Sequence, residues 1–255
     1  MPERRIHMQN MKKYLAELLG TAFLVAMSVG AVVWAGLLGP GPGGFAMPAW
    51  VLVGSLAFGL SLMAIIYIIG PISGAHVNPA VSLAMLMRKK LGLVDFAFYV
   101  VAQIVGAIVG ALFVWGTVSL FAGDTTTLTA GVNTYENIGN ATEAGSIILA
   151  LLVETVLTFV FVLTIIGVVA RGKDNKAVAG LVIGLTLALV HFVGFNITGT
   201  SVNPARSIGT AVFGGVDGLR QVWVFIVAPL AGAALAALAG CYFFGKDKEE
   251  AEAAE

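Results

Sequence analysis

The chain has 255 residues, of which 58% are hydrophobic and only 11% are charged. Soluble domains carry about 25% charged residues, so this composition excludes an ordinary soluble protein and indicates an integral membrane protein. The formal net charge of zero does not suggest a nucleic-acid partner, and the single cysteine, Cys241, excludes an intrachain disulfide and a multi-cysteine metal site.

The first half of the chain contains a long stretch without charge. The basic N-terminal segment 1–13 is followed by an apolar run that is too long for a signal peptide, and we interpret this run as the first span. No Asp, Glu, Lys or Arg occurs from Leu18 to Met87, although one span needs only about 20 residues. Gly and Pro divide this stretch: a turn is predicted at 39–44, and residues 70–74 break the second helix.

Six segments are long enough to cross a membrane, and two further helical segments are about half as long. Full spans are predicted near 14–37, 49–70, 94–120, 146–170, 177–196 and 220–244, and half-helices at 78–88 and 203–213. A helix of about ten residues reaches ~15 Å, half of a ~30 Å hydrocarbon core. Because lipid does not tolerate irregular backbone, the Gly-rich strands before the half-helices must line a cavity or be buried in protein.

Both half-helices begin with the same sequence, Asn-Pro-Ala, at residues 78–80 and 203–205. Asn before Pro is a typical helix start. The flanking residues 73–82 and 198–207 also match in the same register. Each repeat contains three spans, an odd number, so the second repeat must insert upside down. The half-helices then enter from opposite faces and meet near the midplane.

The basic residues predict the orientation of the chain. All Lys and Arg residues except Arg206 and Arg220 fall on one side when six spans are counted, and we assign this side to the cytoplasm. The protein is thus expected to be a multi-pass protein of the cell (plasma or inner) membrane with both termini cytoplasmic. The predicted domains are a cytoplasmic segment 1–13, a first inverted repeat 14–120 with half-helix 78–88, an extracellular loop 121–145, a second inverted repeat 146–244 with half-helix 203–213, and a cytoplasmic tail 245–255.

The two helix starts would have a clear physical effect inside a membrane. Asn78 and Asn203 cap the helices and still present an amide NH₂ to the lumen. The helix dipoles add about half an elementary positive charge each, which opposes cations and protons but lets water pass. The strands before the half-helices would offer a ladder of carbonyl acceptors, from Gly74, Ala75, His76, Val77, Gly199, Thr200, Ser201 and Val202.

With its paired Asn-Pro-Ala motifs and inverted repeats, the chain resembles the aquaporin and glycerol-facilitator (major intrinsic protein) family, and most of all prokaryotic water-selective aquaporins. The resemblance covers roughly residues 12–245. It implies an all-α membrane protein with six transmembrane helices plus two re-entrant half-helices, in an inverted three-span repeat that forms a right-handed helical bundle around a pore. It also implies a homotetramer with one pore per subunit.

The resemblance further implies an outer constriction formed by Phe58, His191, Thr200 and Arg206. An Arg within a span costs about 2.5–3.5 kcal/mol on insertion scales, so Arg206 should face water rather than lipid. Polyol facilitators of this family usually carry Asp directly after this Arg and a small residue in place of the His. The chain has Ser207 and His191 at these positions, and both departures favour water.

Two carboxylates, Glu17 and Glu154, are predicted inside spans. Intramembrane carboxylates suggest a proton relay by default. The resemblance instead implies that they accept hydrogen bonds from the backbone of the re-entrant loops, and we favour this supporting role. Gln103 in the third span is expected to act similarly. Cys241 is expected to be an inert residue in the core of the last span.

The leading prediction is a passive water channel that excludes protons and ions, with water as the permeant, the lipid bilayer as its surroundings and no cofactor or metal. The alternative within the family is a facilitator of glycerol or other small neutral solutes.

A proton-coupled transporter using Glu17, Glu154 and His191 is a different class, but two symmetric helix caps on a fixed lumen favour a channel. No zincin, nucleophile-elbow or phosphate-loop motif indicates an enzyme. A purely structural membrane protein would keep its osmotic permeability unchanged when Arg206 or His191 is altered.

Overall fold

The structure is a computed structural model that describes residues 2–37, 49–122, 128, 131–136, 138, 141–170 and 176–245. All regular secondary structure in these residues is helical. The helices are α1 (Pro2–Leu37), α2 (Ala49–Ser73), α3 (Pro79–Met87), α4 (Leu93–Ala122), α5 (Glu143–Ala170), α6 (Lys176–Thr198), α7 (Pro204–Ala211), α8 (Gly215–Gln221) and α9 (Val224–Phe244).

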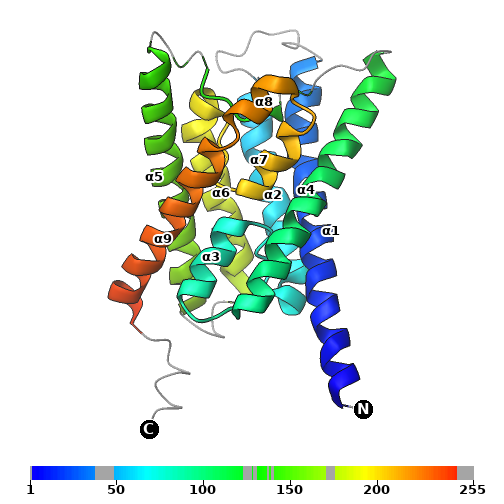
Figure 1. The fold of residues 1–255 in the computed structure, drawn as a ribbon, viewed down its shortest axis with the longest axis vertical. Coiled ribbons are helices and arrows are strands. Elements are labelled where there is room, and N and C mark those ends of the chain that lie inside the picture. Colours follow the sequence, from blue (N-terminus) through cyan, green and yellow to red (C-terminus); the bar gives the residue numbers. More distant parts are fainter. Residues whose placement is uncertain are drawn as a thin grey trace.

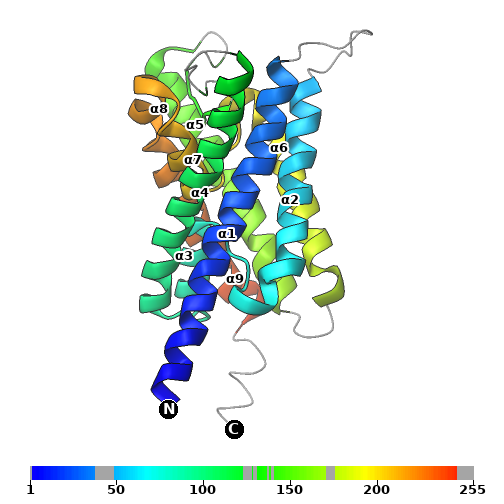
Figure 2. The same cartoon turned by 90° about the vertical axis from the view of Figure 1, so that its right-hand side faces the viewer.

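Six segments of the described chain are long and apolar enough to cross a membrane, the last of them running through α8 and α9. The long helices stand side by side as a bundle (Figure 1). The short helices α3 and α7 lie between them, with α3 in the lower half and α7 in the upper half of the view. The N-terminal end of α1 and the C-terminal end of α9 lie at the same end of the bundle in both views (Figure 2).

The two halves of the chain pack in matching ways. Helix α1 packs against α4 and α2, whereas α5 packs against α9 and α6, and α2 and α6 contact each other between the halves. The short helices also pack equivalently, because α3 and α7 each contact both α4 and α9. Each half-helix is therefore held by long helices from both repeats.

Glycines allow the equivalent helix pairs to approach until their backbones touch. A Cβ added to Gly106 on α4 would lie 2.2 Å from the carbonyl oxygen of Leu18 on α1. A Cβ added to Gly232 on α9 would lie 2.4 Å from the carbonyl oxygen of Thr155 on α5. Lipid offers no hydrophobic drive for helix association, so close backbone approach at small residues is what packs membrane helices.

The predicted helix bounds differ from the structure in several places. Helix α1 begins at Pro2, and its candidate span at Asn10, rather than at 14. Helix α2 continues through Pro71 to Ser73 instead of ending at 70, because Pro removes only one N–H and the amide of Gly74 still donates to the Gly70 carbonyl at 2.9 Å. The chain leaves the helix only at Gly74, where φ is +90°. The last span begins at 215 rather than 220, since α8 precedes α9 and the backbone between them keeps helical angles.

Cys241 is also placed differently from the expectation. It is exposed on the described chain rather than buried in the core, because the whole last turn of α9, residues 241–244, is exposed. The predicted turn at 39–44 and the predicted tail beyond Gly245 lie outside the described residues.

The contact of α1 with α4 can be tested by replacing Gly106 with Ala. The added methyl group meets a backbone atom that cannot rotate away, so the free energy of unfolding should fall by about 1–3 kcal/mol. The matched control is Gly116→Ala on the same helix, where an added Cβ has no neighbour within 4 Å. The control should lose no stability and gain up to about 1 kcal/mol from helix propensity. Thermal unfolding in detergent measures both, and equal melting temperatures would contradict the close packing.

Candidate functional site

Each half-helix begins at an asparagine that caps it. The Oδ1 atom of Asn78 accepts from the Ala80 amide at 2.8 Å, and the Oδ1 atom of Asn203 accepts from the Ala205 and Arg206 amides at 3.1 and 3.3 Å. Both asparagines have extended backbone, and Pro follows at the first helical position, where an N–H would lack a partner anyway.

The two caps are also bonded to each other's loops. The Nδ2 atom of Asn78 donates to the Val202 carbonyl at 2.7 Å, and the Nδ2 atom of Asn203 donates to the Val77 carbonyl at 2.9 Å. The half-helix starts from opposite repeats therefore meet at one point. An amide NH₂ has two N–H groups, so each asparagine keeps one for another acceptor after this bond.

The strands leading into the half-helices adopt an unusual backbone. Positive φ angles recur at non-glycine residues, which costs of order 1–3 kcal/mol at each position and persists only where the surroundings impose it. The affected residues in the two strands are Ala75, Val77, Thr200 and Val202.

Glu17 imposes this conformation on the first strand. Its Oε1 atom accepts from the Ser73 hydroxyl at 2.7 Å and from the His76 amide at 3.0 Å. Its Oε2 atom accepts from the Val77 amide at 2.6 Å and from Nε2 of Gln103 at 2.8 Å. The fully buried carboxylate thus has four donors, and the strand's amides point at it rather than into the space on the other side.

Glu154 occupies the equivalent place in the second half. It accepts from the Thr198 hydroxyl at 2.6 Å, the Ser201 amide at 2.8 Å and the Val202 amide at 2.9 Å. Glu154 is also fully buried. In each strand two backbone amides therefore donate to a buried carboxylate and are not free to bind another molecule.

Three side chains from three helices close one end of this region. The rings of Phe58 on α2 and His191 on α6 stack with centroids 4.1 Å apart, and the guanidinium carbon of Arg206 on α7 lies 5.2 Å from the Phe58 centroid. No water molecule fits between rings at this distance. All three residues are at most 2% exposed.

The polar atoms at this constriction are only partly satisfied. The Nδ1 atom of His191 carries the ring proton, because it lies 2.8 Å from the Leu187 carbonyl oxygen and must donate to it. In the neutral ring, Nε2 is then an acceptor. The Nε2 atom of His191, the Nε atom of Arg206 and the hydroxyl of Thr200 are buried without a partner in the described chain, so they are available to a small polar molecule.

Thr200 lies differently from the other three predicted constriction residues. It is fully buried, and its hydroxyl lies close to α6 at Gly194, where an added Cβ would be 2.7 Å from Oγ1. The cavity next to Phe58, His191 and Arg206 is not lined by Thr200 among the described residues.

Two cavities follow each other along the bundle. A small one of about 10 Å³ lies between the Phe58–His191–Arg206 group and the two asparagines, which is about the space that one water molecule needs. A wide one of about 450 Å³ opens beyond it and reaches Tyr67 and Lys90. Both are lined by Leu62, His76 and Phe161. His76 thus lies where the wide space narrows.

Arg206 has partners that the sequence did not indicate. Its Nη1 atom donates to the Gly131 carbonyl at 3.1 Å and to Oδ1 of Asn133, while Nη2 donates to the Gly199 carbonyl at 3.3 Å. Two of these acceptors lie in the loop between α4 and α5. An isolated Asn in a loop normally indicates only a turn, so no sequence signal distinguished Asn133.

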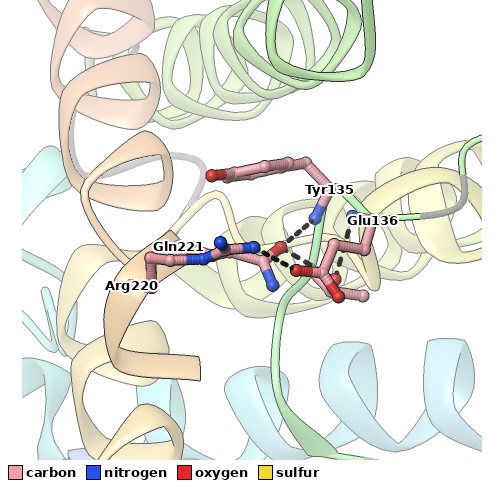
Figure 3. A network of polar contacts seen from close by, with 5 residues as sticks. Tyr135, Glu136, Arg220 and Gln221 are labelled. Carbon is pink, nitrogen blue, oxygen red and sulfur yellow. Dashed lines mark hydrogen bonds and ion pairs between the residues drawn. The ribbon is translucent and has the colours of Figure 1, made fainter. Parts of the chain in front are cut away.

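This loop is fastened to α8 (Figure 3). The Oε1 atom of the buried Gln221 accepts from the Tyr135 amide at 2.8 Å and from the Thr134 hydroxyl at 2.9 Å. An exposed ion pair joins Nη2 of Arg220 to Glu136 at 2.7 Å. The segment that contacts Arg206 therefore has anchors outside the constriction.

Comparison with known proteins identifies the family. The family model described as "Major intrinsic protein" matches residues 5–240. The chain belongs to this family. Its members are channels rather than enzymes, so the chain is a multi-pass membrane channel protein.

Individual relatives of this channel carry two kinds of name. This chain is 41% identical over 227 residues to "Glycerol uptake facilitator protein-like 6" of Lactiplantibacillus plantarum, and the match covers 89% of this chain and 95% of the relative. It is 38% identical over 227 residues to "Aquaporin Z" of Rhodopseudomonas palustris, covering 89% and 90%. The X-ray structure of the aquaglyceroporin from Plasmodium falciparum has the same fold, with a TM-score of 0.74, 24% identity and coverage of 90% and 94%.

Replacing Glu154 with Gln tests how the second re-entrant strand is held. The amide NH₂ of Gln would face backbone N–H donors, so at least one buried donor loses its acceptor, and the free energy of unfolding should fall by about 3 kcal/mol. Glu143→Gln, at an exposed position in the first turn of the same helix, should cost no more than about 1 kcal/mol. Thermal unfolding in detergent compares the two. Equal small effects would mean that the carboxylate does not hold the strand.

Proposed function

We propose that this channel conducts water passively in preference to glycerol and excludes ions. The observation that carries the proposal is the small cavity of about 10 Å³, enclosed between the Phe58–His191–Arg206 group and Asn78 with Asn203. It has room for about one water molecule. Glycerol, with six non-hydrogen atoms, would need these side chains to move much further apart than water does.

The polar groups at this cavity suit water. The free N–H of each asparagine donates to a water oxygen, and the carbonyls of the two strands accept its hydrogens. The unpartnered Nε2 of His191 and Nε of Arg206 offer one acceptor and one donor at the constriction. Because Phe58 and His191 are stacked in contact, a water molecule must displace a ring or pass beside the stack.

Cations and protons are opposed by fixed positive charge. The N-termini of α3 and α7 meet at the paired asparagines and contribute about half an elementary charge each. The full charge of Arg206 lies at the constriction beyond them. A cation would lose its hydration where the protein offers repulsion rather than replacement ligands.

Glycerol conduction is the second candidate, because the relative at 41% identity is named as a glycerol uptake facilitator-like protein. The residues at the constriction weigh against it. His191 fills space that a small residue would leave open, and Ser207 stands where polyol facilitators usually carry Asp.

The proposal also covers the orientation of the chain in the membrane, its oligomeric state and the role of the two buried glutamates. We assign both termini to the cytoplasmic side of a plasma or inner membrane, because the basic residues gather at that end. We also propose a homotetramer with one pore in each subunit, on family resemblance. The two buried glutamates act as supports rather than proton carriers, since Glu17 accepts four hydrogen bonds and Glu154 accepts three.

Stopped-flow light scattering of proteoliposomes tests the solute. After a sucrose upshift, vesicles with the channel should shrink at least about tenfold faster than protein-free vesicles, which corresponds to a barrier lower by about 1.4 kcal/mol. After a glycerol upshift they should shrink equally fast and re-swell slowly. Fast re-swelling would reverse the ranking of water and glycerol, and solute accumulation driven by a pH gradient would exclude a passive channel.

The double variant Phe58→Trp with His191→Gly tests the constriction. Removing the imidazole opens the space beside Arg206, and Trp leaves an apolar wall for the carbon chain of glycerol. Glycerol permeability should rise about tenfold, equivalent to about 1.4 kcal/mol of barrier. Leu189→Ala, at an exposed position on the same helix as His191, serves as the control and should leave glycerol permeability unchanged. An unchanged flux in the double variant would show that these rings do not limit glycerol.

A further inference from the structure

The loop at 131–136 contains a side chain whose position suggests a direct part in selectivity. Asn133 is only 2% exposed. Its Oδ1 atom accepts from Nη1 of Arg206 and from the Ser207 hydroxyl, the latter at 2.7 Å. Its Nδ2 atom donates to the Thr198 carbonyl at 3.0 Å. Both the oxygen and the nitrogen of the side-chain amide thus form hydrogen bonds, and the chemistry of the partners identifies which atom is the oxygen.

These contacts connect three parts of the constriction. Arg206 and Ser207 begin α7, whereas Thr198 ends α6 just before the second re-entrant strand. Thr198 also donates its hydroxyl to Glu154, and its carbonyl receives a second bond from the Thr134 amide at 3.3 Å. Asn133 therefore holds the arginine against the strand that Glu154 supports.

Arg206 depends on this loop for most of its fixed position. Two of the three acceptors of its guanidinium come from the loop, Gly131 and Asn133, and the third is the Gly199 carbonyl. The Nε atom of Arg206 has no partner in the described chain. Asn133 provides the side-chain acceptor among these groups, and a hydrogen bond to a charged donor is worth about twice a neutral one. Without it, the guanidinium keeps only the two backbone carbonyls of Gly131 and Gly199 and is held less firmly.

We propose that Asn133 is a positioning residue for selectivity, which fixes the guanidinium of Arg206 beside Phe58 and so sets the width of the constriction. This inference rests on the proposed water-selective function. An Asn suits the place because it accepts from Arg206 and donates to a carbonyl at the same time. A hydrophobic residue would do neither, and an Asp would keep only the first contact.

The test measures water and glycerol permeability in the same proteoliposomes for the wild type, Asn133→Ala, Arg206→Ala and the double variant. Asn133→Ala loses one charge-assisted hydrogen bond to Arg206. Its ratio of water permeability to glycerol permeability should therefore fall at least about fivefold. In the Arg206→Ala background, removing Asn133 should change the ratio less than about twofold, because the group it positions is already gone. A full fivefold effect in both backgrounds would show that Asn133 does not act through Arg206 and would overturn the proposal.

Two further variants separate positioning from simple support of the fold. Asn133→Asp retains the acceptor for Arg206 and should keep a ratio within about twofold of the wild type, although it loses the bond to Thr198. An Asp variant as unselective as the Ala variant would overturn the proposal. Asn196→Ala, at an exposed position on α6, is the matched control and should keep the wild-type ratio.

The outcomes distinguish this inference from the proposed function. A wild-type protein no more permeable to water than bare vesicles would refute the function itself. A selective wild type with an equally selective Asn133→Ala would refute only the role of Asn133. If the Ala variant does not purify as a monodisperse protein, Asn133→Ser, whose shorter side chain cannot reach Arg206, makes the same comparison.

Discussion

Backbone polar groups at the centre of a membrane protein need partners inside the protein, and two buried carboxylates provide them here. Glu17 and Glu154 each bind the amides of one re-entrant strand. An unsatisfied amide in hydrocarbon costs several kcal/mol, so the strands could not enter the bundle without these acceptors. The same bonds hold residues at positive φ and turn the carbonyls away from the carboxylates. The polar character of the proposed water path follows from them.

A second consequence concerns charge. A carboxylate deep in a bilayer is a candidate for proton transfer when it has a free oxygen. In each of these carboxylates both oxygens instead accept hydrogen bonds from groups of the protein, and these bonds stabilise the negative charge. The two helix N-termini and Arg206 then leave the described path with positive potential at its narrowest parts. The fold and the proposed selectivity against cations therefore depend on the same arrangement of groups.

Much of this architecture could be predicted from the sequence, because the information is local or repeated. Asn followed by Pro indicates a helix start in any setting, and an odd number of spans between two copies indicates an inverted repeat. Contacts made by loops are different. Asn133 approaches Arg206 in a loop that Gln221 on α8 and the Thr198 carbonyl hold in place. No periodicity or spacing in the sequence links these residues. The continuation of α2 through Pro71 was missed for a related reason: the cost of one lost hydrogen bond is decided by the surrounding packing, not by the dipeptide.

The crossed bonds between the asparagines and the opposite loops also bear on how the chain is assembled in the membrane. Asn78 needs the carbonyl of Val202, and Asn203 needs that of Val77, so neither half-helix has its full set of partners while the other is absent. During synthesis the first repeat is completed long before the second. Until the second repeat is in place, the Nδ2 atom of Asn78 lacks its acceptor, the Val202 carbonyl. The seating of the two half-helices is thereby coupled, because neither has its full set of hydrogen bonds until the other is in place.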